Sequence, residues 1–476
     1  MKSFVFLLAL AVYMDANATD HLVSSIEEAN KLLNTAKPND KVLLKDGVYP
    51  NAAISFSNNN ISFVAEHLGK VYFEGNSTLG FAGERNVIEG FVWQNGGKEL
   101  GSRAVIEFRN KKQDADHSTI RNCSIDGYNT ADLNTDNKWV SVYGQYNTVT
   151  ACLFKSKFNR GATLVVWLDG KTEAHHTISY NYFFNRQNGP DADNGLESMR
   201  IGTSETSFTP SNCVVAFNRF EQCDGEIEII SNKSWNNSYL HNTFVNNDGG
   251  LTLRHGNNCL VDGNFFDGAD KAKSYGVRFI GEGHVAINNY FYHLNGSLSQ
   301  SFRAPVTVVN GLVNTPLNGY YQVRRAVIAD NVFVNCITPD IRIGAFSKRD
   351  GMTVAPDTVT IKNNLLFDDA GRVGEVYEEL TAPFHLISKN NKAVGGFLKA
   401  DQKGFDLSNG KGSKRDGFDW IKDGKGNIIA SIESKAALTD NAGVGANWVD
   451  PYIANEAGKR KYSILSAKEV GPVWMR

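Results

Sequence analysis

Three consecutive rows of sequence decide the fold: Asn218-Arg-Phe-Glu-Gln-Cys-Asp-Gly-Glu-Ile-Glu-Ile-Ile-Ser-Asn-Lys-Ser234, Asn242-Thr-Phe-Val-Asn-Asn-Asp-Gly-Gly-Leu-Thr-Leu-Arg-His-Gly256 and Asn264-Phe-Phe-Asp-Gly-Ala-Asp-Lys-Ala-Lys-Ser-Tyr-Gly-Val-Arg-Phe-Ile280. Each row opens with Asn and an aromatic residue, passes a turn that contains Gly and continues into a short apolar strand. The opening Asn residues are 24 and 22 positions apart. A repeat of this length is typical of a solenoid, in which residues one period apart stack on neighbouring parallel strands. We therefore expect an all-β fold.

The same pattern extends along most of the chain. An apolar alternation followed by Asn and an aromatic residue recurs from about residue 41 to 395. Longer gaps after Asn181 and Asn289 indicate two inserted loops, 187–206 and 294–321, which can form a wall beside the stack. Asn tolerates left-handed backbone at turns and can hydrogen-bond along a stack of like residues. The repeated Asn and aromatic residues are therefore expected to stabilise the stack.

The two ends of the chain differ from this pattern. A segment from Ser24 to Leu33 with an apolar stripe predicts a helix, which we expect to cap the first coil, since solenoids need capped ends. Residues 401–476 are rich in Gly and charge, and we interpret them as a C-terminal cap segment of the same domain, with a small separate domain as the alternative. Residues 19–400 then form the solenoid domain itself.

The first 18 residues predict a secretory signal peptide. Lys2 precedes the apolar run 4–14, and Ala16-Asn-Ala18 has the small-x-small pattern of a cleavage site. No later stretch is apolar enough to cross a membrane. We therefore expect an exported bacterial protein, periplasmic or secreted, with no membrane span.

Composition limits the class of partner and the use of cysteine. The 476 residues carry a net charge of −2, which argues against generic nucleic-acid binding but leaves room for a local basic cleft. Cys213 and Cys259 each lie five residues before the Asn of a row, two coils apart, which is too far for a disulfide. We expect the six cysteines to be mostly free, buried and hydrophobic in role.

Charged residues recur in the three rows that define the repeat. Lys233, Arg254 and Arg278 are 21 and 24 positions apart, so the spacing predicts three cations on one face of three consecutive coils. Glu226 and Glu228 are spaced by two, so both carboxylates leave the same side of one strand. Two acids beside a ladder of bases favour a site for an anionic ligand. A solvated, salt-bridged edge of the solenoid is the structural alternative.

These charged segments carry a family resemblance. Gly225-Glu-Ile-Glu-Ile-Ile-Ser-Asn-Lys-Ser234 and Leu253-Arg-His-Gly-Asn257 resemble polysaccharide lyase family 6, which contains alginate lyases and the dermatan-sulfate-cleaving chondroitinase B. Asn194-Gly-Leu-Glu-Ser-Met-Arg-Ile-Gly202 is similar to the same family, and the segment 36–49 is similar to the wider pectate-lyase-like group. The resemblance covers most of the chain to about residue 400. It implies a right-handed parallel β-helix and a β-elimination reaction.

The resemblance also implies roles for single residues. Lys233 matches the general base that takes the C5 proton of a uronate, and Arg254 matches the group that faces the leaving glycosidic oxygen. The implied calcium ligands are Asn194, Glu226 and Glu228, and the implied substrate contacts are Arg200, His255 and Arg278. A hard cation suits this chemistry, because it relieves the build-up of negative charge beside the uronate carboxylate. Arg stays protonated, so the proton donor stays open among Arg254, His255 and water.

Four functions are compatible with these residues. Alginate is the favoured substrate, because the motifs around Lys233 and Arg254 are more similar to the alginate-cleaving members. A dermatan sulfate lyase would use nearly the same site. A polygalacturonase-like hydrolase needs paired Asp residues, whereas Asp136 and Asp368 lie far apart in the repeat. A non-catalytic glycan-binding β-helix is the fourth. The expected partner is an anionic polysaccharide, and the expected assembly is a monomer or a homodimer.

Overall fold

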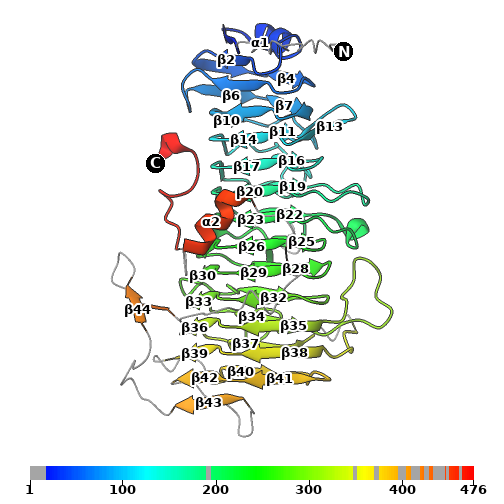
Figure 1. The fold of residues 1–476 in the computed structure, drawn as a ribbon, viewed down its shortest axis with the longest axis vertical. Coiled ribbons are helices and arrows are strands. Elements are labelled where there is room, and N and C mark those ends of the chain that lie inside the picture. The colour runs from blue at the N-terminus through cyan, green and yellow to red at the C-terminus, as the bar shows by residue number, and fades with distance from the viewer. Residues whose placement is uncertain are drawn as a thin grey trace, which may run out of the picture.

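The chain winds as a parallel β-helix whose coils stack along one axis (Figure 1). The computed structural model describes residues 18–188, 194–346, 351–368, 375–394, 404–408, 419–422, 428–431, 445, 450–459 and 464–476. The predicted all-β solenoid is confirmed. The predicted signal peptide falls almost entirely on residues 1–17, outside the described part.

Within the described residues, three long parallel sheets run the length of the stack, with 14, 14 and 12 strands. Sheet 1 consists of β1 (Asp20–Val23), β2 (Lys41–Leu44), β5 (Ser62–Ala65), β9 (Val87–Glu89), β14 (Thr119–Arg121), β17 (Thr148–Thr150), β20 (Thr177–Ser179), β23 (Val214–Ala216), β26 (Ser238–Leu240), β29 (Leu260–Asp262), β32 (Val285–Ile287), β35 (Arg324–Ala329), β38 (Asp357–Lys362) and β41 (Leu386–Lys389). Sheet 2 consists of β3 (Gly47–Pro50), β6 (Val71–Gly75), β10 (Phe91–Gly96), β15 (Ser124–Asp126), β18 (Leu153–Lys155), β21 (Tyr182–Arg186), β24 (Arg219–Cys223), β27 (Thr243–Val245), β30 (Phe265–Asp267), β33 (Tyr290–Tyr292), β36 (Val332–Val334), β39 (Leu365–Phe367), β42 (Asn391–Val394) and β43 (Phe405–Ser408).

Sheet 3 carries most of the predicted site residues. It consists of β4 (Ala53–Phe56), β7 (Thr78–Phe81), β11 (Ile106–Glu107), β16 (Val140–Val142), β19 (Leu164–Val166), β22 (Met199–Ile201), β25 (Glu228–Lys233), β28 (Gly250–His255), β31 (Val277–Phe279), β34 (Val306–Val309), β37 (Ile341–Ala345) and β40 (Tyr377–Glu379). Two small sheets contain β8 (Gly83–Glu84), β12 (Arg109–Asn110) and β13 (Gln113–Asp116), and β44 (Asp419–Lys422) and β45 (Ile428–Ser431). Short 3-10 turns are η1 (Ser204–Thr206) and η3 (Val473–Met475).

The interior of the coils is filled by stacked aromatic rings. Each ring stands two residues after the Asn that opens its row, and successive ring centroids are 4.5 to 5.0 Å apart. The rings are those of Phe183, Phe220, Phe244, Phe266 and Phe291. Such stacked pairs contribute beyond the burial of their area, so the repeated aromatic position holds consecutive coils in line.

A ladder of buried asparagines runs parallel to the aromatic stack. In the described part of the chain it comprises Asn181, Asn218, Asn242, Asn264, Asn289, Asn331, Asn364 and Asn391. The side-chain oxygen of Asn242 accepts hydrogen bonds from the backbone N–H and the Nδ2 of Asn218, both at 3.0 Å. The left-handed backbone lies one residue earlier, at positions such as Phe217 and His241, and not at the ladder Asn itself.

The helix predicted near the N-terminus forms at the first coils. Helix α1 (Ile26–Leu33) begins after Ser25, whose side chain accepts a hydrogen bond from the N–H of Glu28 at 3.2 Å. Ala29 and Leu33 are buried in the main core. Figure 1 shows α1 at the end of the stack where β1 and β2 lie.

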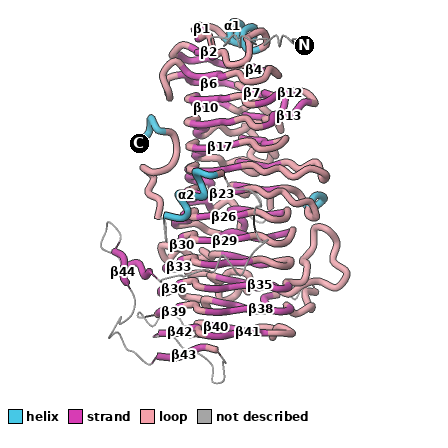
Figure 2. Tube along the Cα trace, in the orientation of Figure 1, coloured by secondary structure: helices cyan, strands magenta, loops and turns pink. Residues whose placement is uncertain are grey.

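The C-terminal residues lie along the side of the β-helix. Helix α2 (Pro451–Lys459) is followed by a segment whose Leu465 N–H donates to Thr243 Oγ1 at 2.9 Å. Further on, Trp474 Nε1 donates to the carbonyl of Asn122 at 3.0 Å. Figures 1 and 2 show this end of the chain beside the stack of coils. The cap over residues 401–476 stays a prediction, because much of that range lies outside the described part. Strand β43 continues sheet 2 beyond residue 400.

All six cysteines lie in described positions, and all six are free and buried, as expected. Burial raises the pKa of the Cys213, Cys223 and Cys259 thiols to about 12. Thiols with so high a pKa are not nucleophilic at neutral pH, so these side chains serve as small hydrophobes.

Replacing a ladder asparagine should destabilise the fold strongly. In Asn242→Ala the backbone N–H and Nδ2 of Asn218 lose their acceptor, and the carbonyl of Val215 loses a donor. We expect a loss of about 2–4 kcal/mol in the free energy of unfolding, since these groups stay buried. Urea unfolding measures it, with the exposed Asn134→Ala as control. Equal unfolding midpoints for the two variants would contradict a structural role for the ladder.

Buried histidines should make the fold sensitive to acid. His284 Nδ1 accepts from the Cys259 N–H at 3.1 Å, and burial lowers the pKa of His284 to about 4 from 6.5. The stability that this neutral ring contributes is therefore fully present above pH 6.5 and is lost as the pH falls towards about 4. In His284→Asn an amide oxygen can replace the acceptor without titrating. Thermal unfolding at a series of pH values should show a shallower loss of stability for the variant than for the parent protein.

Candidate active site

Sheet 3 loses its regular register where β25 meets β28. The pairing contains two extra residues, Ile229 on β25 and Arg254 on β28, and neither has a partner on the opposite strand. Extra residues of this kind bend a strand locally and change the direction of the side chains beside them. The predicted site residues gather around this irregularity.

The three predicted cations lie on the consecutive strands β25, β28 and β31, but they do not occupy paired positions. Lys233 lies opposite His255 and not opposite Arg254, and Arg278 lies opposite Thr252. The extra residue Arg254 shifts the partner of Lys233 by one position. The three cations nevertheless line one common groove.

This groove, here called the reaction groove, has a volume of about 910 Å³. Its floor comes from sheet 3, and both predicted insertions, 187–206 and 294–321, contribute to its walls. The lining residues are Asn194, Glu197, Ser204, Glu226, Ile227, Glu228, Lys233, Arg254, His255, Arg278, Ser299, Gln300, Ser301, Phe302, Arg303, Asn318, Tyr320 and Phe346. Seven of the eight predicted site residues are therefore brought together.

Arg200 is the predicted residue that does not line the reaction groove. It lies on β22, opposite Ser231 of β25, so it is one coil away from Lys233. Its guanidinium lies over the ring of Trp167, 5.3 Å from the centroid. The position places a cation at the edge of the groove, towards the first coils.

A cluster of buried carboxylates lies at one side of the reaction groove. Glu197 and Glu226 are both buried, and Glu197 Oε2 has no hydrogen-bond partner among the described residues. Burial, together with the charges of Glu197 and Glu228, raises the pKa of Glu226 well above its usual range. The cluster thus lacks positive charge, and a bound cation would supply it.

Glu228 differs from its two neighbours because arginines balance its charge. Its Oε1 accepts from Arg278 at 2.5 Å and lies 3.7 Å from Arg254 Nε, while Oε2 accepts from Ser231 at 2.5 Å. Burial alone would raise the pKa of Glu228, but the charges of Arg278 and Arg254 lower it. Each carboxylate oxygen has a second lone pair, so Glu228 can still bind a cation.

The donor set fits calcium. Three carboxylates and the amide oxygen of Asn194 line the same groove, and oxygen ligands of this kind suit a hard divalent cation. Sequence analysis missed Glu197, although it stands three residues after Asn194 in a segment that carried the family resemblance. Only the fold shows that its side chain reaches the groove of Glu226.

The amine and the imidazole of the groove are both available for chemistry. Lys233 is half-buried, and no hydrogen bond or ion pair to another residue in the described ranges holds its amine. His255 is buried, and its Nε2 lies 3.3 Å from Ser204 Oγ. Burial, with the charges of Arg254 and Lys233, lowers the pKa of His255 to about 2. At neutral pH His255 is therefore an uncharged ring.

Arg254 is held by the second insertion. Its guanidinium donates to the carbonyls of Gly319 at 2.7 Å and Asn318 at 2.9 Å. It also lies 4.3 Å from the centroid of the Tyr320 ring. The sequence indicated an inserted loop here but carried no sign of these contacts, because they depend on how the loop folds back over β28.

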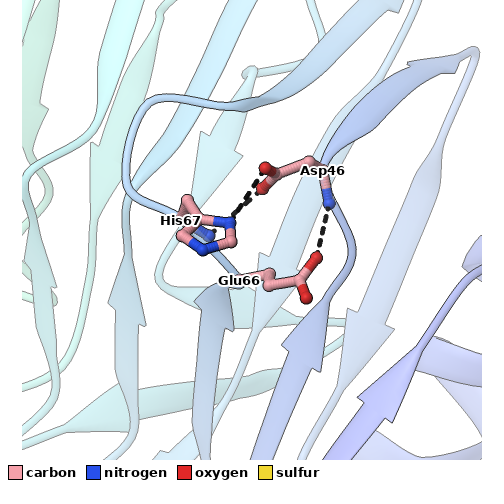
Figure 3. A group of neighbouring side chains, drawn as sticks. All are labelled: Asp46, Glu66 and His67. Atoms are coloured by element: carbon pink, nitrogen blue, oxygen red, sulfur yellow. Dashed lines mark hydrogen bonds and ion pairs between the residues drawn. The ribbon is translucent and has the colours of Figure 1, made fainter.

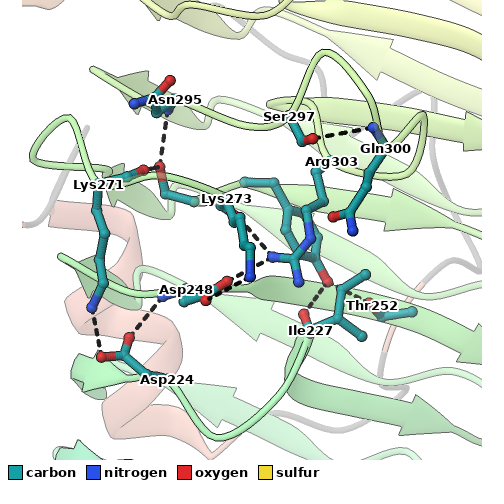
Figure 4. Close-up of polar contacts among 12 residues, drawn as sticks. Asp224, Ile227, Asp248, Thr252, Lys271, Lys273, Asn295, Ser297, Gln300 and Arg303 are labelled. Atoms are coloured by element: carbon teal, nitrogen blue, oxygen red, sulfur yellow. Dashed lines mark hydrogen bonds and ion pairs between the residues drawn. The ribbon is translucent and has the colours of Figure 1, made fainter. Parts of the chain in front are cut away.

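A polar network anchors the wall of the groove to the coils below (Figure 4). Arg303 donates to Asp248 Oδ1 and to the carbonyl of Lys273, both at 2.8 Å. Tyr275 donates to the carbonyl of Ile227, between the two glutamates, at 2.5 Å. The loop and the strand that carry the lining residues are thus fixed by buried hydrogen bonds.

A second group of potential metal ligands lies on the first coils, far from the groove. It consists of Asp46, Glu66 and His67, all exposed (Figure 3). His67 Nδ1 lies 2.9 Å from Asp46 Oδ2, and the Asp46 N–H donates to Glu66. These polar atoms form hydrogen bonds to one another and are exposed to water. They therefore do not require a cation in the way that the buried carboxylates of Glu197 and Glu226 do.

Comparison with known proteins places this geometry in a family. A family model described as Chondroitinase B matches residues 23–413. Among solved structures, the chain is similar to the PL6 family alginate lyase AlyGC, with 30% sequence identity and a TM-score of 0.80 over 96% of this chain. The match covers 59% of that lyase, so the chain spans about 59% of its length.

A mannuronic acid specific family 6 lyase from human gut microbiota is also similar. It matches with 26% identity and a TM-score of 0.72, over 82% of this chain and 91% of that one. No curated protein matches the chain. Since the family model extends over most of the sequence and the same fold recurs in these solved lyases, the chain belongs to polysaccharide lyase family 6.

Proposed function

We propose that the protein is a polysaccharide lyase that cleaves alginate by calcium-assisted β-elimination. One observation carries the proposal: a single groove holds the unpaired amine of Lys233, the buried carboxylates Glu197 and Glu226, and the fixed guanidinium of Arg254. An amine, a cation site and a fixed positive charge are what removal of a proton beside a carboxylate requires. The family of the chain supports the same reaction.

The carboxylate cluster would provide the calcium site. Asn194, Glu197, Glu226 and Glu228 would hold Ca²⁺, which when bound neutralises the uronate carboxylate and so makes the adjacent C5 proton easier to remove. The residues Arg278, His255 and Arg200 would contact the substrate, because each stands in or beside the groove. Their charges and ring N–H suit an acidic sugar.

Lys233 would take the C5 proton. Its amine lines the reaction groove, and no hydrogen bond or ion pair to another described residue holds it. Arg254 would stabilise the negative charge that develops on the leaving glycosidic oxygen, held in place by two backbone carbonyls. At neutral pH the imidazole of His255 is uncharged and has no readily lost proton. Arg254 and water then remain as sources of the proton for the leaving oxygen.

The runner-up substrate is dermatan sulfate, supported by the description of the matching family model. Alginate is preferred because the solved structures at 30% and 26% identity are an alginate lyase and a mannuronic acid specific lyase. A non-catalytic glycan-binding protein is the alternative from another class. Whether the protein acts as a monomer or a homodimer stays open.

We also propose that the protein is exported to the periplasm or beyond, on the basis of the predicted signal peptide. In the ranges that the structure describes, no helix is long and apolar enough to cross a membrane.

Replacing the proposed base should abolish elimination. Lys233→Ala should lose on the order of 100-fold or more in kcat, since a positioned base contributes about that much. The assay is ultraviolet absorbance of the unsaturated uronate product, with alginate or dermatan sulfate and with or without a calcium chelator. Circular dichroism checks that the fold persists, and the exposed Lys112→Ala serves as control.

Each result of this assay has a distinct meaning. A rise on alginate that the chelator suppresses supports the substrate, the reaction and the metal together. A rise on dermatan sulfate alone would keep the reaction and change the substrate. Flat absorbance on both polymers would leave a glycan-binding protein, and near-normal turnover by Lys233→Ala would remove it from the role of base.

Glu197→Gln should separate the metal site from the rest of the groove. Without calcium the variant should be at least as stable as the parent, because one buried negative charge beside Glu226 is gone. The stabilisation that added Ca²⁺ produces should need on the order of ten-fold more metal, as expected for a lost ligand. Thermal unfolding in a calcium titration measures both, with the exposed Glu205→Gln as matched control. Identical titrations for the two variants would exclude Glu197 from the site.

A further inference from the structure

A second groove lies on the same face of sheet 3, nearer the first coils. This distal groove has a volume of about 520 Å³ and runs from β4 to β19. Its lining residues are Ala53, Ile54, Ser55, Thr78, Leu79, Gly80, Ser102, Arg103, Ala104, Glu107, Arg109, Asn110, Lys111, Lys138, Ser141, Tyr143 and Trp167. None of these residues belongs to the reaction groove.

One column of side chains connects the two grooves. When the register of the paired strands is continued past their ends by one or two residues, five residues of successive coils fall in one line: Arg109, Tyr143, Trp167, Gly202 and Lys233. The Arg109 guanidinium lies 3.5 Å over the Tyr143 ring, and the Tyr143 and Trp167 rings stack 6.1 Å apart. The proposed base therefore stands in line with an aromatic platform.

Gly202 stands between Trp167 and Lys233 in this line and packs closely against the backbone of Lys233. Its φ is +77°, and a Cβ atom there would meet the carbonyl oxygen of Lys233 at 2.8 Å. Arg200, two residues earlier, lies over Trp167 at 5.3 Å and bridges the same interval with positive charge. Arg200 therefore places a positive charge between the two grooves.

The distal groove favours anions. Among its lining residues, four are basic and one, Glu107, is acidic. Arg103 and Lys111 are exposed, and neither forms an ion pair with another residue in the described ranges. Arg109 and Lys138 are paired with Asp114 and Asp136, respectively. Two cations thus remain free to pair with a ligand.

We propose that the distal groove binds a remote segment of the same anionic polysaccharide that is cleaved at Lys233, an inference that rests on the proposed function. Strand spacing of about 4.8 Å puts β11 about 19 Å from β25, four coils away. A polymer lying along sheet 3 reaches both grooves, whereas a short oligosaccharide at Lys233 does not. Arg103 and Lys111 would pair with carboxylates of the polymer, and the partly exposed side chains of Tyr143 and Trp167 would contact its sugar rings beside the cations that cover them.

The test compares two neighbouring lysines. Lys111 lines the distal groove, while Lys112, also exposed, does not. Lys111→Glu should lower kcat/KM on polymeric alginate on the order of five-fold, as loss of an exposed ion pair implies, and much less on a trisaccharide. The doubly substituted Arg103→Glu, Lys111→Glu protein should show a larger difference between the two substrates. Lys112→Glu should behave like the parent protein on both.

A binding measurement separates this inference from the proposed function. In the Lys233→Ala background, migration through a native gel containing alginate reports polymer binding without turnover, and Lys111→Glu should be retarded less than Lys112→Glu. Equal retardation and equal kcat/KM on polymer for the two variants would overturn the distal site, even if the parent protein cleaves alginate. A parent protein that cleaves no uronate polymer, but whose retardation depends on Lys111, would overturn the proposed function alone.

Discussion

The structure depends on a fixed register between successive coils. A ladder asparagine such as Asn242 can satisfy its neighbours only when each coil is aligned with the next, because its oxygen accepts two hydrogen bonds from Asn218. All these groups are buried, so a slip by one residue would leave them unsatisfied. Because of this alignment, residues that are distant in sequence lie in straight columns on the outer faces of the sheets. The column from Arg109 to Lys233 is one of them.

The reaction groove arises where this register is broken. The pairing of β25 with β28 contains one extra residue on each strand. Lys233 lies opposite His255 and Arg278 opposite Thr252, so the three cations surround the groove and do not form a line. The carboxylates of this groove differ in their partners. Glu228 forms an ion pair with Arg278, whereas Glu197 and Glu226 form no ion pair with a described residue. Glu226 accepts a hydrogen bond from the Leu196 N–H. Buried carboxylates without an ion pair are costly, which is consistent with a site kept for a cation and not for stability.

The repeat was predictable because it is local. Each row carries its own Asn, its own interior Phe and its own turn, so the coil and its sheets follow from the period alone. Spacing placed three cations and two glutamates on one wall, and the family resemblance added Asn194, Arg200 and His255. The pairing of single residues could not be predicted from spacing, because the extra residue Arg254 sets Lys233 opposite His255. Glu197 and Tyr320 depend on two insertions whose folded paths no period describes, so no local pattern marked them.

Regular and irregular coils then suit different tasks. A linear polymer that lies along the axis of a β-helix meets one equivalent position after another, which favours repeated, modest contacts such as those of Arg109, Tyr143 and Trp167. Bond cleavage needs several different groups around one sugar, and straight columns cannot supply them. The two extra residues at β25 and β28 convert a column into a pocket at one point along the chain. Binding over many coils and chemistry at one coil therefore follow from a single architecture with a local irregularity at the reaction groove.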